Sequence, residues 1–199
     1  MAEPTHVQQH GNMLFVLLDD GTKRAGYPTG SNLWIIKGKE GDNGGGGPVD
    51  PGNPGEWAWP FPLSQVTSEF HAPDRPNHQG IDFGSGASNQ AGTPIPSAGA
   101  GVVIVANNTQ DYGGYGNAVV VQHDGAGPNG QTVYIVYGHM SSPGPAVSVG
   151  QSVTKGQNLG PIGQTGNSFG NHLHFEVRCG SNSTNSAVNP RDFMATKGL

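Results

Sequence analysis

The sequence predicts an all-β protein, mainly antiparallel, in which short strands alternate with long connections. Composition gives the first reason: of 199 residues, 34 are glycine and 16 are proline, and only 12% are charged, which disfavours long helices. The second reason is patterning, because the apolar runs are short and are separated by clusters of Gly, Asn, Asp, Ser and Pro. Such connections are better suited to walling a groove than to building a core.

Residues 1–37 predict a small N-terminal strand-rich segment. Met13–Leu18 is typical of a strand, Asp20-Gly21 of a turn, and Leu33–Lys37 of a second strand. A segment of about forty residues buries too little apolar surface to be stable alone. We therefore expect it to dock to copies of itself, to the larger domain or to a host assembly. A marginal appendage without a binding role is the alternative.

Residues 38–56 predict a linker, because this stretch contains eight Gly and three Pro and almost nothing apolar. Residues 57–199 predict one β domain. Its expected strands, in chain order, are Gln65–Phe70, Gly80–Phe83, Thr93–Pro96, Gly101–Ala106, Asn117–His123, Thr132–Tyr137, Asn158–Ile162 and Leu173–Arg178.

Two histidine motifs in this domain indicate a metal site. His172 and His174 are two residues apart in a predicted strand, so both imidazoles lie on one face. Upstream, His78 and Asp82 lie where a loop enters another strand, and the Asp82 side chain points away from its apolar neighbours. Imidazoles plus one carboxylate, with a position left open, are typical of catalytic zinc. Each motif alone also fits chance spacing or paired surface histidines.

For each of two further polar residues, the sequence allows two structural roles. His139 follows the predicted strand Thr132–Tyr137, where we expect the chain to leave the sheet, and it is either part of the site or a surface histidine at a strand end. Glu176 shares the strand parity of the two histidines before it, so it either orients one of their rings or is a solvated carboxylate.

The order of HxGxD, YGH and HLHFE resembles the zinc endopeptidases of the lysostaphin and LytM type, the M23 peptidases. The similarity covers roughly 62–194 and extends beyond these motifs. It includes the family-like segments 92–95, 115–120, 149–153, 155–157, 163–168 and 189–190. The resemblance implies a lysostaphin-type antiparallel sheet with a groove walled by loops. The loops 72–77 and 124–130 depart from the family pattern. We expect these departures to affect substrate preference and not catalysis.

The resemblance also implies a role for each site residue. His78, Asp82 and His174 would bind Zn²⁺, and His139 and His172 would be catalytic histidines that bind no metal. The implied activity is hydrolysis of peptide bonds in the stem or cross-bridge of bacterial peptidoglycan. No Glu stands in an HExxH arrangement, so the two histidines are the candidates for general base. The alternative is a non-catalytic wall-binding or phage tail structural module that keeps the fold.

Composition narrows the partners and the place of action. The formal net charge of −5 comes without a basic stripe, which argues against nucleic acid. No apolar run is long enough for membrane insertion, and the N-terminus lacks the features of a signal peptide. We therefore expect a phage endolysin or virion-associated hydrolase. Such an enzyme acts at the extracellular wall, reaching it in a virion or by release from the host cytoplasm at lysis, and its N-terminal segment can dock to itself or to a phage assembly.

Overall fold

A computed structural model of the chain describes residues 57–109 and 112–199 in full, and the backbone of six short strands between residues 4 and 37. The chain divides into two compact units, Met1–Asp50 and Pro51–Leu199. The predicted linker 38–56 and the predicted turn Asp20-Gly21 lie outside the described residues. The domain limits 1–37, 38–56 and 57–199 therefore stay predictions.

The N-terminal unit is strand-rich, as predicted, but contains more strands than the apolar runs indicate. An antiparallel sheet has the order β1-β2-β3-β6, formed by Pro4–His10, Met13–Leu18, Lys23–Gly26 and Ile36–Lys37. The prediction of one strand over Leu33–Lys37 is wrong, because β5 (Asn32–Leu33) pairs with β4 (Pro28–Thr29) in a separate sheet. An apolar run alone does not select the pairing partner of its residues.

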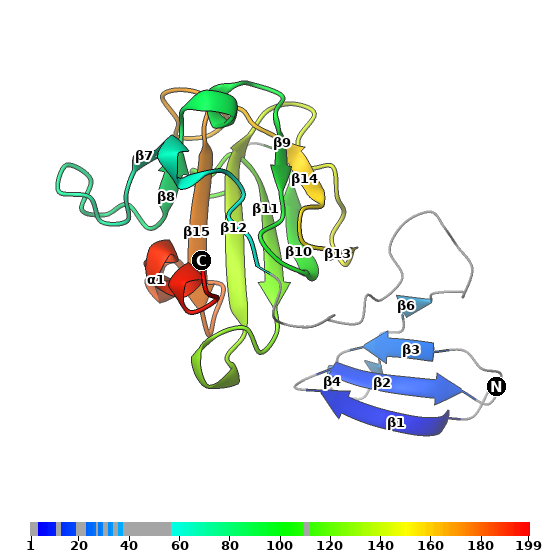
Figure 1. The fold of residues 1–199 in the computed structure, drawn as a ribbon. Coiled ribbons are helices and arrows are strands. Elements are labelled where there is room, and N and C mark those ends of the chain that lie inside the picture. The colour runs from blue at the N-terminus through cyan, green and yellow to red at the C-terminus, as the bar shows by residue number, and fades with distance from the viewer. Residues whose placement is uncertain are drawn as a thin grey trace. The chain divides into compact units, whose positions relative to one another are not determined.

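The second unit is built on one antiparallel sheet (Figure 1) with the strand order β13-β10-β11-β12-β15-β8-β7, and β16 pairs with β15. The strands are β7 (Val66–Ser68), β8 (Ile81–Phe83), β10 (Gly101–Asn107), β11 (Asn117–His123), β12 (Val133–Met140), β13 (Ser152–Val153), β15 (Leu173–Cys179) and β16 (Ala187–Val188). Thus β15, near the end of the chain, lies between β12 and β8, and joins segments distant in sequence.

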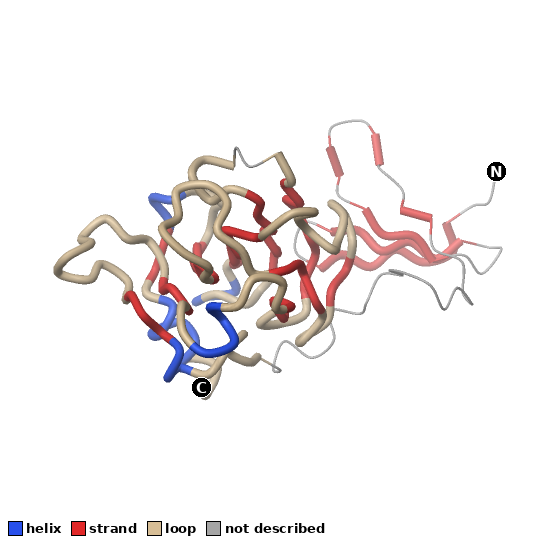
Figure 2. Tube along the Cα trace, turned by 90° about the horizontal axis from the view of Figure 1, so that it is seen from above, coloured by secondary structure: helices blue, strands red, loops and turns tan. Residues whose placement is uncertain are grey.

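Little of this unit is helical. In residues 57–109 and 112–199, the elements outside the main sheet are the pair β9 (Pro94–Pro96) and β14 (Asn158–Pro161), the 3-10 turns Leu63–Gln65, Gly86–Asn89, Pro128–Gly130 and Thr184–Ser186, and one α-helix, α1 (Pro190–Ala195). Figure 2 shows how much of the remainder is loop. Among the described residues, no helix has the length and apolarity that a membrane crossing needs.

The main sheet has one apolar face and one mixed face. Along β15, Leu173, Phe175 and Val177 enter the core, while the alternate residues His174, Glu176 and Arg178 are buried on the opposite face. The same alternation in β8, β11 and β12 supplies the core residues Ile81, Phe83, Val119, Val121, Val133, Ile135 and Tyr137. The apolar face holds the strands in register, and the mixed face is left for polar chemistry.

The predicted all-β, antiparallel class is confirmed, and the eight strands predicted within 57–199 all occur, with ends shifted by at most three residues. The sequence did not predict β13, β16 or α1. The two strands have only two residues each, and α1 is a short helix begun by the Asn189 side chain, which accepts from the Arg191 N–H, and by Pro190. One prediction is wrong: the strand carrying Tyr137 does not end there but continues to Met140.

Candidate functional site

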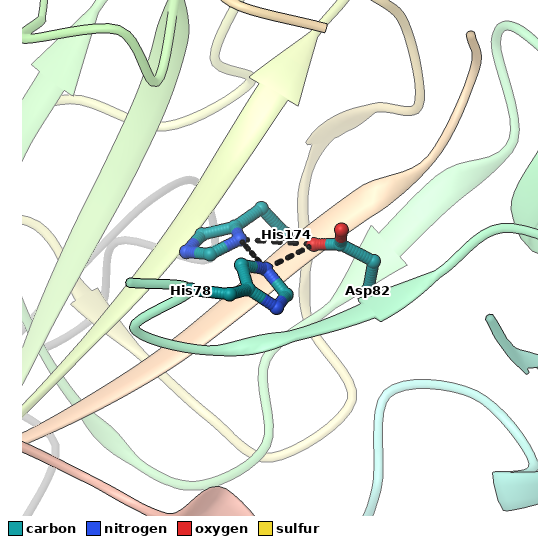
Figure 3. A group of neighbouring side chains, drawn as sticks. All are labelled: His78, Asp82 and His174. Atoms are coloured by element: carbon teal, nitrogen blue, oxygen red, sulfur yellow. Dashed lines mark hydrogen bonds and ion pairs between the residues drawn. The ribbon is translucent and has the colours of Figure 1, made fainter. Parts of the chain in front are cut away.

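Strand pairing brings the two predicted metal motifs together. His174 of β15 lies directly opposite Asp82 of β8 in antiparallel register, so both side chains project from the same face of the sheet. His78 lies in the loop that enters β8 (Figure 3). His174 Nδ1 lies 2.9 Å from Asp82 Oδ1 and 3.1 Å from His78 Nε2, which is 3.0 Å from the same Asp82 oxygen. Three buried donor atoms therefore meet at one point.

Hydrogen bonds on the outer side of each ring determine which nitrogen faces this point. His78 Nδ1 lies 2.8 Å from the Glu69 carbonyl oxygen, which can only accept, so Nδ1 carries the proton and Nε2 keeps its lone pair. His174 Nε2 lies 3.2 Å from Glu176 Oε2, so its Nδ1 faces inward. An imidazole whose other nitrogen donates to a carbonyl or carboxylate is the usual form of a metal ligand.

The centre of the site favours positive charge. Although burial opposes a charged imidazole, hydrogen bonds to Asp82 and Glu176 raise the pKa of His174 to about 9. Burial likewise opposes the charged carboxylate of Asp82, but His174 and His78 hold its pKa far below the ordinary value. Both shifts show that the space between these groups favours a positive charge. A divalent cation would supply the same charge to two imidazoles and a carboxylate, which is a donor set suited to zinc.

A buried network continues from His174 along β15. Glu176 is fully buried and accepts hydrogen bonds from the Tyr115 hydroxyl at 2.7 Å and from Arg178 Nε at 2.6 Å. Arg178 also donates to the Tyr115 hydroxyl and to Asn182. Burial raises the pKa of a carboxyl group, but these partners and His174 hold that of Glu176 below its usual range. Of the two readings of Glu176, the ring-orienting one is therefore correct.

Gly80 leaves room for this arrangement. A Cβ atom at residue 80 would lie 2.5 Å from the Phe175 carbonyl oxygen and 2.8 Å from the His174 ring. Any side chain here would therefore displace β15 or the ligand ring. The glycine of the HxGxD motif is thus required for steric reasons, separate from the chemistry of the two candidate ligands beside it.

The two remaining histidines lie beside the cluster. His172 Nε2 is 3.7 Å from Asp82 Oδ1, and its Nδ1 bonds the Gly170 carbonyl oxygen at 2.9 Å. His139 Nδ1 bonds the Thr165 carbonyl oxygen at 2.8 Å, and the His139 and His172 ring centroids are 4.6 Å apart. In both rings the carbonyl holds a proton on Nδ1, so Nε2 is the nitrogen left for proton exchange.

A β-bulge turns His139 toward the site. The β11–β12 register shifts between Asn117 and Val119, so β12 carries an extra residue there. His139 has a φ of 64°, in the left-handed region, and its N–H donates to the Tyr115 carbonyl at 2.7 Å. Bulges redirect side chains, and strained backbone of this kind is concentrated at functional sites. The bulge keeps His139 within the sheet, where the sequence had predicted a departing chain.

These groups open onto a groove of about 420 Å³, a size typical of ligand sites. The groove is lined by Arg75, Pro76, Asn77, His78, Gln79, Gly113, Gly114, Tyr115, His139, Asn167, His174 and Glu176. Burial, followed by the neighbouring His172 and His174, lowers the pKa of His139 to about 4, so this ring is neutral at pH 7. A neutral imidazole at a groove can accept a proton.

All five residues predicted for the site, His78, Asp82, His139, His172 and His174, lie together. The sequence reasoning missed three partners. Arg178 could have been found, because it continues the two-residue period of His172, His174 and Glu176. Tyr115 and Arg75 come from loops, so no period pointed to them.

Known proteins of one peptidase family resemble most of this unit in sequence. Residues 76–190 match the model of peptidase family M23. A curated relative, the peptidoglycan DD-endopeptidase ShyA of Vibrio cholerae, is 38% identical over 100 residues, which is 50% of this chain and 20% of that protein. The chain thus corresponds to about a fifth of that relative's length.

Two solved structures share the fold. A mutant catalytic domain of the prophage-encoded M23 protein EnpA from Enterococcus faecalis has a TM-score of 0.52 at 30% identity, over 68% of this chain and 95% of that chain. The antimicrobial peptidase lysostaphin from Staphylococcus simulans has a TM-score of 0.50 at 28% identity, over 73% of this chain and 51% of that chain. The predicted lysostaphin-type fold is confirmed.

Proposed function

The chain belongs to peptidase family M23, and from this premise we propose that it is a zinc-dependent endopeptidase that hydrolyses peptide bonds in the stem or cross-bridge of bacterial peptidoglycan. The observation that carries the proposal is the buried meeting point of His78 Nε2, Asp82 Oδ1 and His174 Nδ1 at the wall of an open groove. The relative ShyA is a peptidoglycan DD-endopeptidase by name, which supports the substrate class.

In this proposal His78, Asp82 and His174 hold the metal through the three atoms that face one another. Zinc held there would acidify a water molecule and polarise the carbonyl of the scissile peptide. Glu176 orients the His174 ring by accepting from Nε2. The Glu69 carbonyl does the same for His78. Because these outer bonds hold both rings with their other nitrogen toward Asp82, the two rings would need little rearrangement to bind a metal.

His139 and His172 carry out the proton transfers. In each ring a backbone carbonyl holds the Nδ1 proton, so Nε2 is the nitrogen that exchanges protons. At pH 7 the neutral His139 accepts a proton from the attacking water or, once protonated, donates to the leaving amine. A protonated imidazole beside the carbonyl also stabilises the oxyanion of the tetrahedral intermediate. The two rings can divide these duties because they lie side by side.

We further propose a phage context, as an endolysin or virion-associated wall hydrolase. The likeness to a prophage-encoded M23 catalytic domain supports it. The strand-rich unit before the peptidase would dock to itself or to a phage assembly, and the chain would act at the cell wall. Cosedimentation of the full chain with purified virions, compared with a chain that lacks residues 1–37, tests the docking role. Absence of the full chain from virions would exclude the virion-associated role.

The test of the main proposal is digestion of purified peptidoglycan by zinc-loaded protein, followed by mass spectrometry of the released peptides. New amino termini within stem or bridge peptides, lost with chelator and restored by zinc, are the expected result. His71→Asn is the matched control, because His71 is an exposed histidine with a φ of 49°, which Asn tolerates. Zinc-loaded protein that leaves walls of several chemotypes intact would indicate the non-catalytic module instead.

A further inference from the structure

Arg75 connects the candidate metal centre to the groove. Its Nη1 donates to Asp82 Oδ2 at 2.6 Å and to Ser68 Oγ at 3.2 Å. The other Asp82 oxygen, Oδ1, is the one that faces His78 and His174. The Arg75 side chain is 49% exposed, whereas that of Asp82 is 5% exposed. Arg75 thus reaches from solvent to the outer oxygen of a proposed ligand.

The backbone holds Arg75 in place. Its N–H donates to the Ala72 carbonyl at 2.8 Å, and its own carbonyl accepts from the His78 N–H at 2.9 Å. Pro76, directly after it, restricts the local backbone further. A short hydrogen-bonded turn therefore separates Arg75 from the first ligand, so the guanidinium starts from a fixed position although its side chain is half exposed.

Most of the guanidinium is still available for binding. Within residues 57–109 and 112–199, neither Nε nor Nη2 of Arg75 has a hydrogen-bond partner, and these two atoms form one edge of the planar group. Arg75 also lines the groove, together with His78 and His139. The other arginine near the site is fully used, since Arg178 donates to Glu176, Tyr115 and Asn182.

We propose that Arg75 is a specificity-determining residue: its Nε and Nη2 edge binds a carboxylate of the peptide substrate while Nη1 stays on Asp82. The proposal rests on the proposed endopeptidase function and names the substrate class, an acidic peptide with a free carboxylate near the scissile bond. A guanidinium edge matches a carboxylate with two parallel N–H···O bonds, and a neutral amide offers a poorer match. Peptides without a carboxylate at this position are poorer substrates.

The test uses synthetic stem peptides in matched pairs, in which each carboxylate in turn is replaced by a primary amide. Steady-state kinetics give kcat and KM for the protein, for Arg75→Gln and for Arg75→Lys, and metal analysis gives the zinc content of each. Arg191→Gln is the control, because Arg191 is a surface arginine whose guanidinium pairs with Glu69. For one carboxylate position we expect kcat/KM to favour the acid by about tenfold or more, mainly through KM.

Arg75→Gln should lower this acid-to-amide ratio to near one while zinc stays bound, and Arg75→Lys should give an intermediate ratio, because it keeps the charge without the fork. Arg191→Gln should keep the ratio of the unchanged protein. Calorimetry in a zinc-loaded His139→Ala background measures binding of the same pairs without turnover. There too the acid should bind more tightly, and the added Arg75→Gln change should abolish the difference.

Two outcomes would overturn the proposal. One is a ratio near one for every pair in the unchanged protein. The other is an equal loss on acid and amide in Arg75→Gln, which would mean that Arg75 acts only through Asp82. If no peptide is cleaved while calorimetry still gives an Arg75-dependent preference for the acid, the endopeptidase proposal fails and the carboxylate site stands. Cleavage of all pairs without preference for the acid would have the opposite meaning: the endopeptidase proposal stands and the carboxylate site fails.

Discussion

Two buried histidines on one sheet have opposite surroundings. His174 of β15 is 6% exposed and His123 of β11 is 2% exposed. Both nitrogens of His174 face carboxylates, which raise its pKa to about 9 against the effect of burial. His123 donates from Nδ1 to the Ala100 carbonyl and packs against the Trp57 ring, and burial lowers its pKa to about 4. Burial alone therefore does not make a cation site; the neighbouring carboxylates do.

Removal of His174 should have the largest effect. His174→Ala deletes one of three inward donor atoms and leaves Asp82 and Glu176 without their shared partner, so zinc binding and peptidoglycan hydrolysis should be lost together, with kcat reduced about 10³-fold or more. Metal analysis and a hydrolysis assay measure the two losses. A variant that kept one zinc per chain with full activity would contradict the placement of the metal here.

His139→Ala should separate chemistry from metal binding. His139 donates to a backbone carbonyl and bonds none of the three proposed ligands, so zinc content should stay near that of the unchanged protein. Loss of a proton-transfer group should lower kcat about 10²- to 10⁴-fold. Parallel measurement of zinc stoichiometry and kcat tests this, and full activity would remove His139 from the mechanism.

His123, the buried histidine outside the candidate site, should make the free energy of unfolding depend on pH. Since the pKa of His123 is about 4 in the folded protein and 6.5 ordinarily, the unfolded chain binds more protons between these values. The contribution of His123 to stability is therefore complete above pH 6.5, falls as pH decreases toward 4, and changes by about 3 kcal/mol over this window. Denaturant unfolding at several pH values measures it.

The control for this prediction is His123→Gln, which cannot titrate. Its unfolding free energy should be lower at neutral pH, because the packing against Trp57 changes, but it should fall less between pH 6.5 and 4 than that of the unchanged protein. The proposed metal site should be unaffected by this substitution, so zinc content at pH 7.5 should be equal in the two proteins. An unchanged pH profile would mean that His123 is not the titrating group.

Glu176→Gln should give the smallest effect, and it tests most directly the difference between the surroundings of His174 and His123. The variant keeps the size of the side chain and removes the charge that His174 Nε2 faces, so the His174 environment becomes more like that of His123. Zinc affinity should fall about 10- to 100-fold, as is typical when such an outer partner is changed. Competition with a chelating dye measures this affinity. An affinity equal to that of the unchanged protein would show that Glu176 does not support the ligand.

The sequence by itself determined the fold class and singled out the five residues that the structure brings together at the candidate site. Period-two spacing placed His172 and His174 on one face, and the apolar neighbours of Asp82 indicated an inward carboxylate, because these patterns are local consequences of strand geometry. The HxGxD, YGH and HLHFE motifs together identified the family. Local patterns of this kind are readable because each depends only on a few adjacent residues.

Tertiary structure alone decided the rest. The register of β8 against β15 sets Asp82 opposite His174, and a bulge in β12 turns His139 inward; both depend on pairing between distant segments. The outer hydrogen bonds decide which nitrogen of each ring faces the centre. Arg75 reaches Asp82 from a loop that has no periodic pattern. Contacts between residues far apart in the chain leave no local signature, so the sequence could name the site residues but not their geometry.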